Sequence, residues 1–114
     1  MKVSGVGIDA VEISRFRTVL RMKNDRFLEN TFTKVEREYC FSFRDAASHF
    51  AGTFAAKEAV RKTSGLVKTP MNKIEIRRHK SGKPEVWLSG RRSKSHLISI
   101  SHNRSIACAI AMQQ

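Results

Sequence analysis

The sequence predicts an α+β fold in one domain spanning residues 1–114. Only two prolines occur, and no proline-rich linker divides the chain. Apolar residues recur at helical spacing between residues 13 and 59, whereas apolar and polar residues alternate with period two between residues 73 and 112. A single strand before the helices and an antiparallel set of strands after them are typical of the α+β class.

The first predicted elements are a strand and a helix. Residues 3–8 indicate a short strand, in which Gly5 and Gly7 allow another backbone to come close. The helix that follows has apolar residues at helical spacing: Ile13, Phe16, Val19 and Leu20. Its other faces carry basic side chains: Arg15, Arg17, Arg21 and Lys23. We expect residues 24–25 (ND) to end this helix and to cap a short turn through residues 27–28.

Two more helices are predicted by their capping residues. Residues 33–36 (TKVE) match a capping box, which predicts a helix from there to about residue 43. Asp45 is placed to cap a longer, alanine-rich helix over residues 46–59, because alanine is the best helix former. Gly65 favours the left-handed conformation that often terminates a helix.

The last third of the chain predicts four strands, at residues 73–77, 85–88, 97–101 and 106–112. Turns are expected at residues 80–84 and at residues 102–105. In the last strand, one face carries larger side chains: Ile106, Cys108, Ile110 and Met112. The other face carries only alanines, which lets a packed helix or a neighbouring subunit approach closely.

The charge distribution bounds the function. The chain has 22 Lys and Arg against 10 Asp and Glu, a formal net charge of +12. Residues 61–114 hold 12 of the basic and 2 of the acidic side chains. Such a segment is typical of a protein with an anionic partner: nucleic acid, an acidic protein, a phosphate-rich small molecule or a membrane surface. Among these partners, charge alone favours nucleic acid. An equally good explanation of the charge is a solvated surface that is merely basic and binds no partner.

Several function classes are disfavoured because their motifs are missing. No run of about 18 apolar residues occurs that would cross a membrane, and the N-terminus lacks the apolar centre of a signal peptide. Cys40 and Cys108 fit neither a metal spacing nor a disulfide framework, so we expect a reduced, cytoplasmic protein. The sequence has no P-loop, no Gly-x-Ser-x-Gly elbow and no zinc-ligand spacing among its four histidines.

Taken singly, the candidate site residues have ordinary explanations. Asp9 follows the first predicted strand, where a carboxylate suits a ligand site but is more often a cap or a surface acid. Glu58 and Lys62 are four residues apart and share one helix face, as in a surface ion pair worth about 0.3–0.5 kcal/mol. The turn at residues 82–84 and the polar hairpin end at residues 101–102 are equally unspecific.

In combination these segments resemble a known family, the holo-(acyl-carrier-protein) synthases, which are small free-standing 4′-phosphopantetheinyl transferases. Four segments resemble the family signatures in order and spacing: residues 7–16 (GIDAVEISRF), 54–59 (FAAKEA), 82–84 (GKP) and 98–102 (ISISH). Lys62 and Gly65 follow the second signature, as they do in the family. Each motif is weak singly, but their joint occurrence over nearly the whole chain is highly specific.

The resemblance implies an enzyme that transfers the phosphopantetheine arm of coenzyme A to a serine of apo acyl carrier protein, releasing adenosine 3′,5′-bisphosphate, in fatty acid biosynthesis. It also implies helices packed on a small, mainly antiparallel sheet, and a homotrimer with active sites between subunits. Asp9 and Glu58 match the magnesium ligands of the family. Six residues match its coenzyme A site: Lys62, Gly82, Lys83, Pro84, Ser101 and His102.

These residue types suit that chemistry. Mg²⁺ is typically held by one or two carboxylates together with substrate phosphates and water, and it neutralises charge on the phosphate under attack and on the leaving group. Lys62, one turn beyond Glu58, adds a fixed positive charge to the same phosphates. Either Glu58 or a metal-bound water takes the proton of the carrier's serine, and the sequence does not separate the two.

The basic helix near Asp9 also has a use in this scheme. Acyl carrier proteins are acidic, and we expect Arg15 and Arg21 to help dock the carrier. Thr53 stands where relatives often carry Arg or Lys, and Asn103 stands where Thr or an acid is common. Neither departure removes a metal ligand, so we expect an effect on affinity rather than on chemistry.

Two alternatives stay open. A basic nucleic-acid-binding protein without enzymatic activity accounts for the net charge of +12 and predicts binding with a steep salt dependence. It gives no reason for Asp9, Glu58 and Lys62, and Trp87 is the only aromatic residue of the basic segment that would stack on a base. The second alternative is a related protein that binds coenzyme A without turnover.

Overall fold

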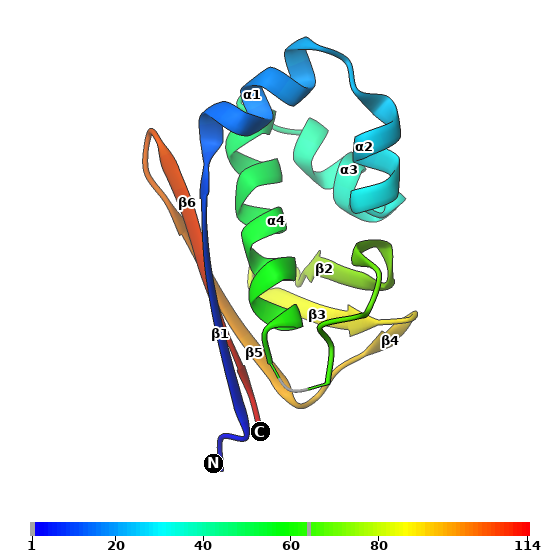
Figure 1. Ribbon diagram of the computed structural model, residues 1–114, viewed down its shortest axis with the longest axis vertical. Helices are drawn as coiled ribbons and strands as arrows, with labels where there is room; N and C mark the ends of the chain where they lie inside the picture. The colour runs from blue at the N-terminus through cyan, green and yellow to red at the C-terminus, as the bar shows by residue number, and fades with distance from the viewer. Residues whose placement is uncertain (1, 64) are drawn as a thin grey trace.

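A computed structural model describes residues 2–63 and 65–114 of the chain (Figure 1). In chain order its elements are β1 (Gly5–Glu12), α1 (Ile13–Arg21), α2 (Asp25–Thr31), α3 (Lys34–Phe41), α4 (Ala46–Arg61), a 3-10 turn (Met71–Lys73), β2 (Ile74–Arg78), β3 (Pro84–Leu88), β4 (Arg91–Arg92), β5 (His96–His102) and β6 (Ile106–Gln113). One strand, four helices and a set of antiparallel strands follow one another, so the predicted α+β class is confirmed.

Two small antiparallel sheets flank the long helix α4. The strand order is β1-β6-β5 in the first sheet and β2-β3-β4 in the second. Figure 1 shows α4 running alongside the first sheet, with α1 across its upper end and α2, α3 and β2 on its other side. The alanine-rich sequence of α4 suits this central place, because small side chains let neighbouring elements approach from several sides.

Strand β1 is longer than the sequence predicted and contains Asp9. The local pattern places the strand at residues 3–8, with Asp9 after its end. In the structure, all eight residues of β1 pair with β6, so Asp9 lies inside the sheet. The pairing partner comes from the other end of the chain, and local alternation carries no information about it. His102 likewise belongs to β5, whereas the sequence placed it at the opening of a turn.

The helix caps follow the prediction with one correction. Asn24 caps α2 through its side chain, and Thr33 and Glu36 form the predicted capping box of α3. Asp45 does precede α4, but its carboxylate makes no cap. It accepts two hydrogen bonds from the Arg17 guanidinium of α1, at 2.8 and 3.3 Å. A charged, bidentate donor offers this carboxylate a stronger partner than a neutral backbone amide does.

The ends of two helices differ from the prediction: α3 is shorter, and α4 runs two residues beyond residue 59 without reaching Gly65. Helix α3 ends at Phe41 rather than near residue 43, and α4 ends at Arg61, before Gly65. Gly65 does adopt a left-handed conformation, with φ of +80°, but it lies beyond the last helical turn. Lys62 takes the capping position of α4 instead, and its amide bonds back to helix carbonyls.

The alanine face of β6 meets α4. Ala107, Ala109 and Ala111 are buried there, so a helix and not a neighbouring subunit covers this face. On the adjacent strand β1, a Cβ at Gly7 would lie 1.9 Å from the carbonyl oxygen of Ala59. Only glycine permits this approach, which brings β1 against the C-terminal half of α4.

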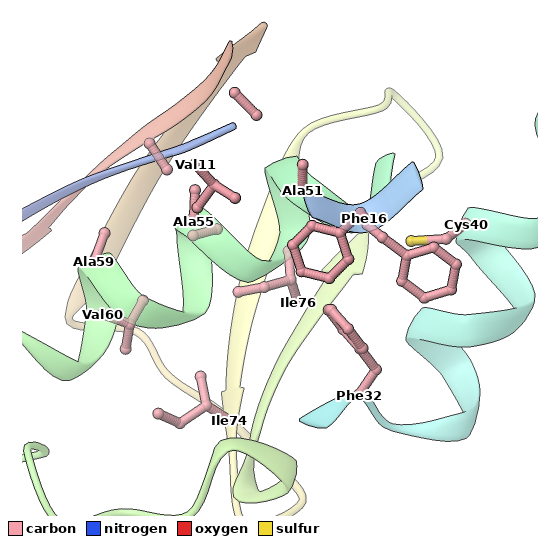
Figure 2. Close-up of a cluster of buried hydrophobic side chains, with 14 of the residues drawn as sticks. Val11, Phe16, Phe32, Cys40, Ala51, Ala55, Ala59, Val60, Ile74 and Ile76 are labelled. Atoms are coloured by element: carbon pink, nitrogen blue, oxygen red, sulfur yellow. The ribbon is translucent and has the colours of Figure 1, made fainter. Parts of the chain in front are cut away.

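An aromatic cluster fills the opposite side of α4. Phe16, Phe32 and Phe50 are fully buried, with ring centroids 4.9 to 6.5 Å apart. Figure 2 shows Phe16 and Phe32 within the cluster of buried side chains that surrounds Ala51 of α4. Because Phe16 comes from α1, the cluster fixes the helix that carries the predicted docking arginines.

A buried ion pair that the sequence did not reveal crosses the core. The side chains of Lys57 and Glu36 are fully buried, and Nζ lies 2.6 Å from Oε1. Lys57 also donates to the carbonyl oxygen of Thr31 at 2.6 Å. Glu36 accepts from the amides of Thr33 and Ile76, at 2.9 and 2.7 Å. Burial lowers the pKa of Lys57, and the charge of Glu36 opposes that shift. The pair ties α4 to three other elements.

Candidate functional site

Asp9 and Lys62 meet where β1 crosses the end of α4. The Lys62 ammonium donates to the carbonyl oxygen of Ile8 at 2.8 Å and to Asp9 Oδ1 at 3.2 Å. The Asp9 side chain is mostly buried, whereas that of Lys62 is half exposed. Gly7 makes the meeting possible, because a Cβ there would also press on Lys62 Cβ, at 3.0 Å. We call this place the α4–β1 seam; it comprises Asp9 and Lys62, which are in contact, and Glu58, which lies one helical turn before Lys62.

Glu58 lies one helical turn before Lys62 and lines the same shallow hollow of about 210 Å³. The two side chains do not form the surface ion pair that their spacing of four allows. Glu58 Oε1 instead accepts from Arg61 at 3.1 Å, and Arg61 also donates to the carbonyl oxygen of Val67 at 2.7 Å. The acid thus faces the seam beside a cation, with its second oxygen making no hydrogen bond to a described residue.

The donor set of the seam fits a divalent cation that prefers oxygen. Asp9 and Glu58 supply two carboxylates, the number by which Mg²⁺ is commonly held. Within residues 2–63 and 65–114, no group of three or more His, Cys, Asp or Glu side chains gathers to hold a metal. An ion here would therefore need further oxygens from phosphate groups or water, which suits a phosphate-bearing substrate.

A second group of predicted residues lines a separate pocket of about 290 Å³. Gly82, Pro84 and His102, which were predicted to belong to the coenzyme A site, lie there together. Lys83 lines a neighbouring hollow with Pro84 instead. Ser101 is exposed and points to the opposite face of β5 from His102, because side chains alternate along a strand. The structure thus brings together three of the six residues predicted for the coenzyme A site, and Lys62 lies apart from them at the α4–β1 seam.

Other residues that the sequence did not single out also line this pocket, and three of them carry rings or charge: Tyr39, His49 and Arg78. His49 stacks on Phe43 with ring centroids 3.6 Å apart and meets His102 edge to face at 5.9 Å. Burial lowers the pKa of His49, and the charges of His102 and Arg78 lower it further. Arg78 gives this pocket a positive charge, and Tyr39 and His49 give it aromatic rings, so we call it the basic pocket; such a lining suits an anionic ligand with a ring. No local motif marks these residues, since they come from α3, α4 and β2.

The two groups of residues lie at opposite ends of α4. His49 belongs to its first turn and Lys62 follows its last residue. Thirteen residues of helix separate them by about 20 Å along the axis. One chain therefore presents the acidic seam and the basic pocket as separate surfaces.

The predicted docking arginines lie on α1. The Arg15 guanidinium stacks over the Phe54 ring at 4.9 Å, and Arg21 is exposed in the last turn. The two departures from the family pattern lie outside both hollows. Thr53 is buried against Cys40, at 3.7 Å, and Asn103 accepts from the amides of its own turn.

The outer face of the first sheet is apolar and exposed. β1 contributes Val6 and Ile8, whose exposed fractions are 55% and 65%. β5 and β6 add partly exposed apolar side chains: Leu97, Ile106 and Ile110. A contiguous apolar surface of this kind on a small domain marks an interaction site.

Among the helices described, none combines the length and the apolar character needed to cross a bilayer.

Comparisons with known proteins agree with one another. The sequence profile of the 4′-phosphopantetheinyl transferase superfamily matches residues 5–111. The holo-[acyl-carrier-protein] synthase of Chlamydia caviae is 41% identical over 122 residues, which cover 98% of each chain. The crystal structure of a holo-(acyl-carrier-protein) synthase from Bacillus anthracis in complex with CoA (3′,5′-ADP) superposes with a TM-score of 0.79 at 31% identity, covering 97% of this chain and 96% of that one. For the Helicobacter pylori holo-[acyl-carrier-protein] synthase in complex with coenzyme A, the TM-score is 0.81 at 28% identity, with 96% and 99% covered.

Proposed function

This chain belongs to the 4′-phosphopantetheinyl transferase superfamily, and we propose that it is a holo-[acyl-carrier-protein] synthase, which transfers the phosphopantetheine arm of coenzyme A to a serine of apo acyl carrier protein. The other product is adenosine 3′,5′-bisphosphate, and the pathway served is fatty acid biosynthesis. The observation that carries the proposal is the α4–β1 seam, where Lys62 contacts Asp9 one helical turn from Glu58.

The residues of the seam have distinct roles in this reaction. Asp9 and Glu58 would hold Mg²⁺, which when bound neutralises charge on the phosphate under attack and on the leaving group. Lys62, fixed by the Ile8 carbonyl and Asp9, directs its positive charge at the same phosphates. The serine oxygen of the carrier forms the new P–O bond, and the diphosphate bond to the nucleotide breaks. The serine proton passes to Glu58 or to a water beside it.

The coenzyme A site would be completed by a neighbouring subunit. The seam and the basic pocket with His102 are separated by about 20 Å of α4, so one chain does not bring them to one phosphate. The exposed apolar face with Ile8 supports the homotrimer that the resemblance implies, because burying it in a subunit interface is favourable. In such a trimer, the Gly82-Lys83-Pro84 turn and His102 of one subunit would face the seam of the next.

The surplus positive charge would serve the carrier protein. Arg15 and Arg21 on α1 are placed to attract an acidic partner, and charges of this kind raise association rates more than they raise affinity. We further propose that the enzyme works in the cytoplasm, where its carrier and coenzyme A are found. Nucleic acid is not a partner in this scheme.

The intact mass of a carrier protein tests the proposal. The protein is incubated with coenzyme A, Mg²⁺ and an apo acyl carrier protein, and a gain of one phosphopantetheine arm is expected. Omission of Mg²⁺, or the Glu58→Gln variant, should abolish the gain. No gain with several carriers would reject the enzyme. Tight, salt-sensitive DNA binding would then favour the nucleic-acid alternative, and coenzyme A binding alone would favour a protein without turnover.

A further inference from the structure

A buried hydrogen-bond chain lies directly beside Lys62. Thr63 Oγ1 donates to the carbonyl oxygen of Val60 at 2.6 Å and lies 3.2 Å from His96 Nε2. The other ring nitrogen of His96 lies 2.7 Å from Ser93 Oγ. Thr63 and His96 are only 1% and 7% exposed. The chain therefore joins the end of α4 to the start of β5 through two buried side chains, those of Thr63 and His96.

The direction of each bond follows from proton counting. A threonine hydroxyl carries one proton, and that of Thr63 is given to the carbonyl oxygen of Val60. Thr63 Oγ1 is thus only an acceptor toward His96, so Nε2 carries the ring proton. Nδ1 of His96 is then an acceptor, and the Ser93 hydroxyl donates to it. Each polar atom of the chain is paired, which a buried network requires.

Two consecutive residues thereby pin the end of α4 to both edges of the first sheet. Lys62 reaches the edge strand β1 through Ile8 and Asp9. Thr63 reaches the other edge strand, β5, through His96. The last turn of a helix lacks part of its hydrogen bonds and frays unless other groups hold it. The bond from Thr63 to His96 holds this turn at the residue that follows Lys62.

We propose that Thr63 and His96 are positioning residues for the transfer reaction, which keep the Lys62 ammonium at Asp9. The inference rests on the proposed function for the role of Lys62 in catalysis. Neither residue belongs to the four signature segments, and neither lines the seam or the basic pocket, although His96 lines the neighbouring hollow with Lys83 and Pro84. Thr63 touches none of the predicted coenzyme A residues of the basic pocket and acts through Lys62, so the loss of its hydroxyl is felt only while Lys62 is present.

Thr63→Val and Thr63→Ser form the test and its matched control. Valine keeps the shape but removes the acceptor, which leaves His96 with an unpaired buried nitrogen, whereas serine keeps the hydroxyl. We expect Thr63→Val to lower kcat by about ten-fold with an unchanged KM for the carrier, and Thr63→Ser to behave like the parent. Combined with Lys62→Ala, Thr63→Val should lower kcat no further. The proposal would be overturned if Thr63→Val lowered kcat equally in the parent and in Lys62→Ala. It would also be overturned if Thr63→Ser lowered kcat as much as Thr63→Val.

A second measurement does not depend on the reaction. The rate at which acetic anhydride modifies Lys62 is followed by mass spectrometry in the parent and in both Thr63 variants. Release of Lys62 from Asp9 should raise this rate several-fold in Thr63→Val and leave it unchanged in Thr63→Ser. An unchanged rate in Thr63→Val overturns the positioning role. The two proposals can fail separately. If the parent protein has no transferase activity and the labelling pattern is still as expected, the proposed function is rejected, and the role of Thr63 in holding Lys62 is retained.

Discussion

Replacing Glu36 by Gln should test how far the buried ion pair stabilises the fold. The Glu36 carboxylate accepts from Lys57, Thr33 and Ile76, and Gln has only one oxygen with which to accept. The amide nitrogen of Gln would face the Ile76 N–H as a second donor, and the Lys57 charge would lose its counter-ion. Removing one partner of a buried pair typically costs about 3–5 kcal/mol. This is a large part of the roughly 6–17 kcal/mol expected for 114 residues.

Urea unfolding at one protein concentration measures the loss. The matched control is Glu38→Gln, because Glu38 pairs with Lys34 at 3.9 Å on the exposed surface, where such a pair is worth less than about 1 kcal/mol. Burial already lowers the pKa of Lys57, and removing Glu36 takes away the charge that opposes this shift. Between the lowered pKa of Lys57 in the folded state and the ordinary pKa of lysine, the unfolded chain binds more protons than the folded one, so the stability of Glu36→Gln should rise with pH across that window. A loss no larger than that of Glu38→Gln, or one independent of pH, would refute this reasoning.

Three further predictions concern the site and the buried histidine. Glu58→Gln should keep the urea midpoint of the parent while transfer falls by at least about 100-fold; near-normal turnover with Mg²⁺ would remove Glu58 from the mechanism. Arg15→Glu should raise KM for the carrier at low salt and leave the affinity for coenzyme A, measured by calorimetry, unchanged. If the affinity for coenzyme A weakens as much as KM for the carrier rises, the docking role is contradicted. Burial lowers the pKa of His96, so neutral His96 stabilises the fold fully above about pH 6.5. As the pH falls from there towards the pKa of His96 in the folded state, the free energy of unfolding drops by at most about 1.4 kcal/mol per pH unit. Urea curves at several pH values should therefore show a flatter acid limb for His96→Gln, and an unchanged limb would assign the titration to another group.

Local signals in the sequence predicted most of the elements, because their causes are local. The capping box that begins at Thr33 needs only four residues, and the alternation in β6 needs only seven. The misplaced features depend on distant partners. The Asp45 carboxylate was expected to cap α4, but Arg17, 28 residues earlier, binds it instead. Lys57 reads as an ordinary helix lysine until the fold brings Glu36 to it across 21 residues.

The candidate site was predictable as a set of residues but not as a set of contacts. Spacing places Glu58 and Lys62 on one face of α4, and the structure agrees. Which partner each takes depends on the position of β1, which the close approach of Gly7 to α4 fixes. Lys62 then pairs with Asp9, 53 residues away, and Glu58 is left to Arg61. No pattern along the chain contains that information.

The two faces of β6 connect the fold to the proposed assembly. The sequence allowed either a helix or a neighbouring subunit on the face of Ala109, and α4 occupies it. The opposite face, with Ile106 and Ile110, therefore remains for a neighbour, and Ile8 of β1 extends it. A second copy on this face would bury apolar surface that the single chain leaves in water. It would also offer a basic pocket to a seam that, among the residues described, has two carboxylates and no third acidic, His or Cys ligand for an ion. The same alternation that buries the alanines of β6 against α4 leaves its isoleucines exposed. This exposed face supports an active site shared between subunits.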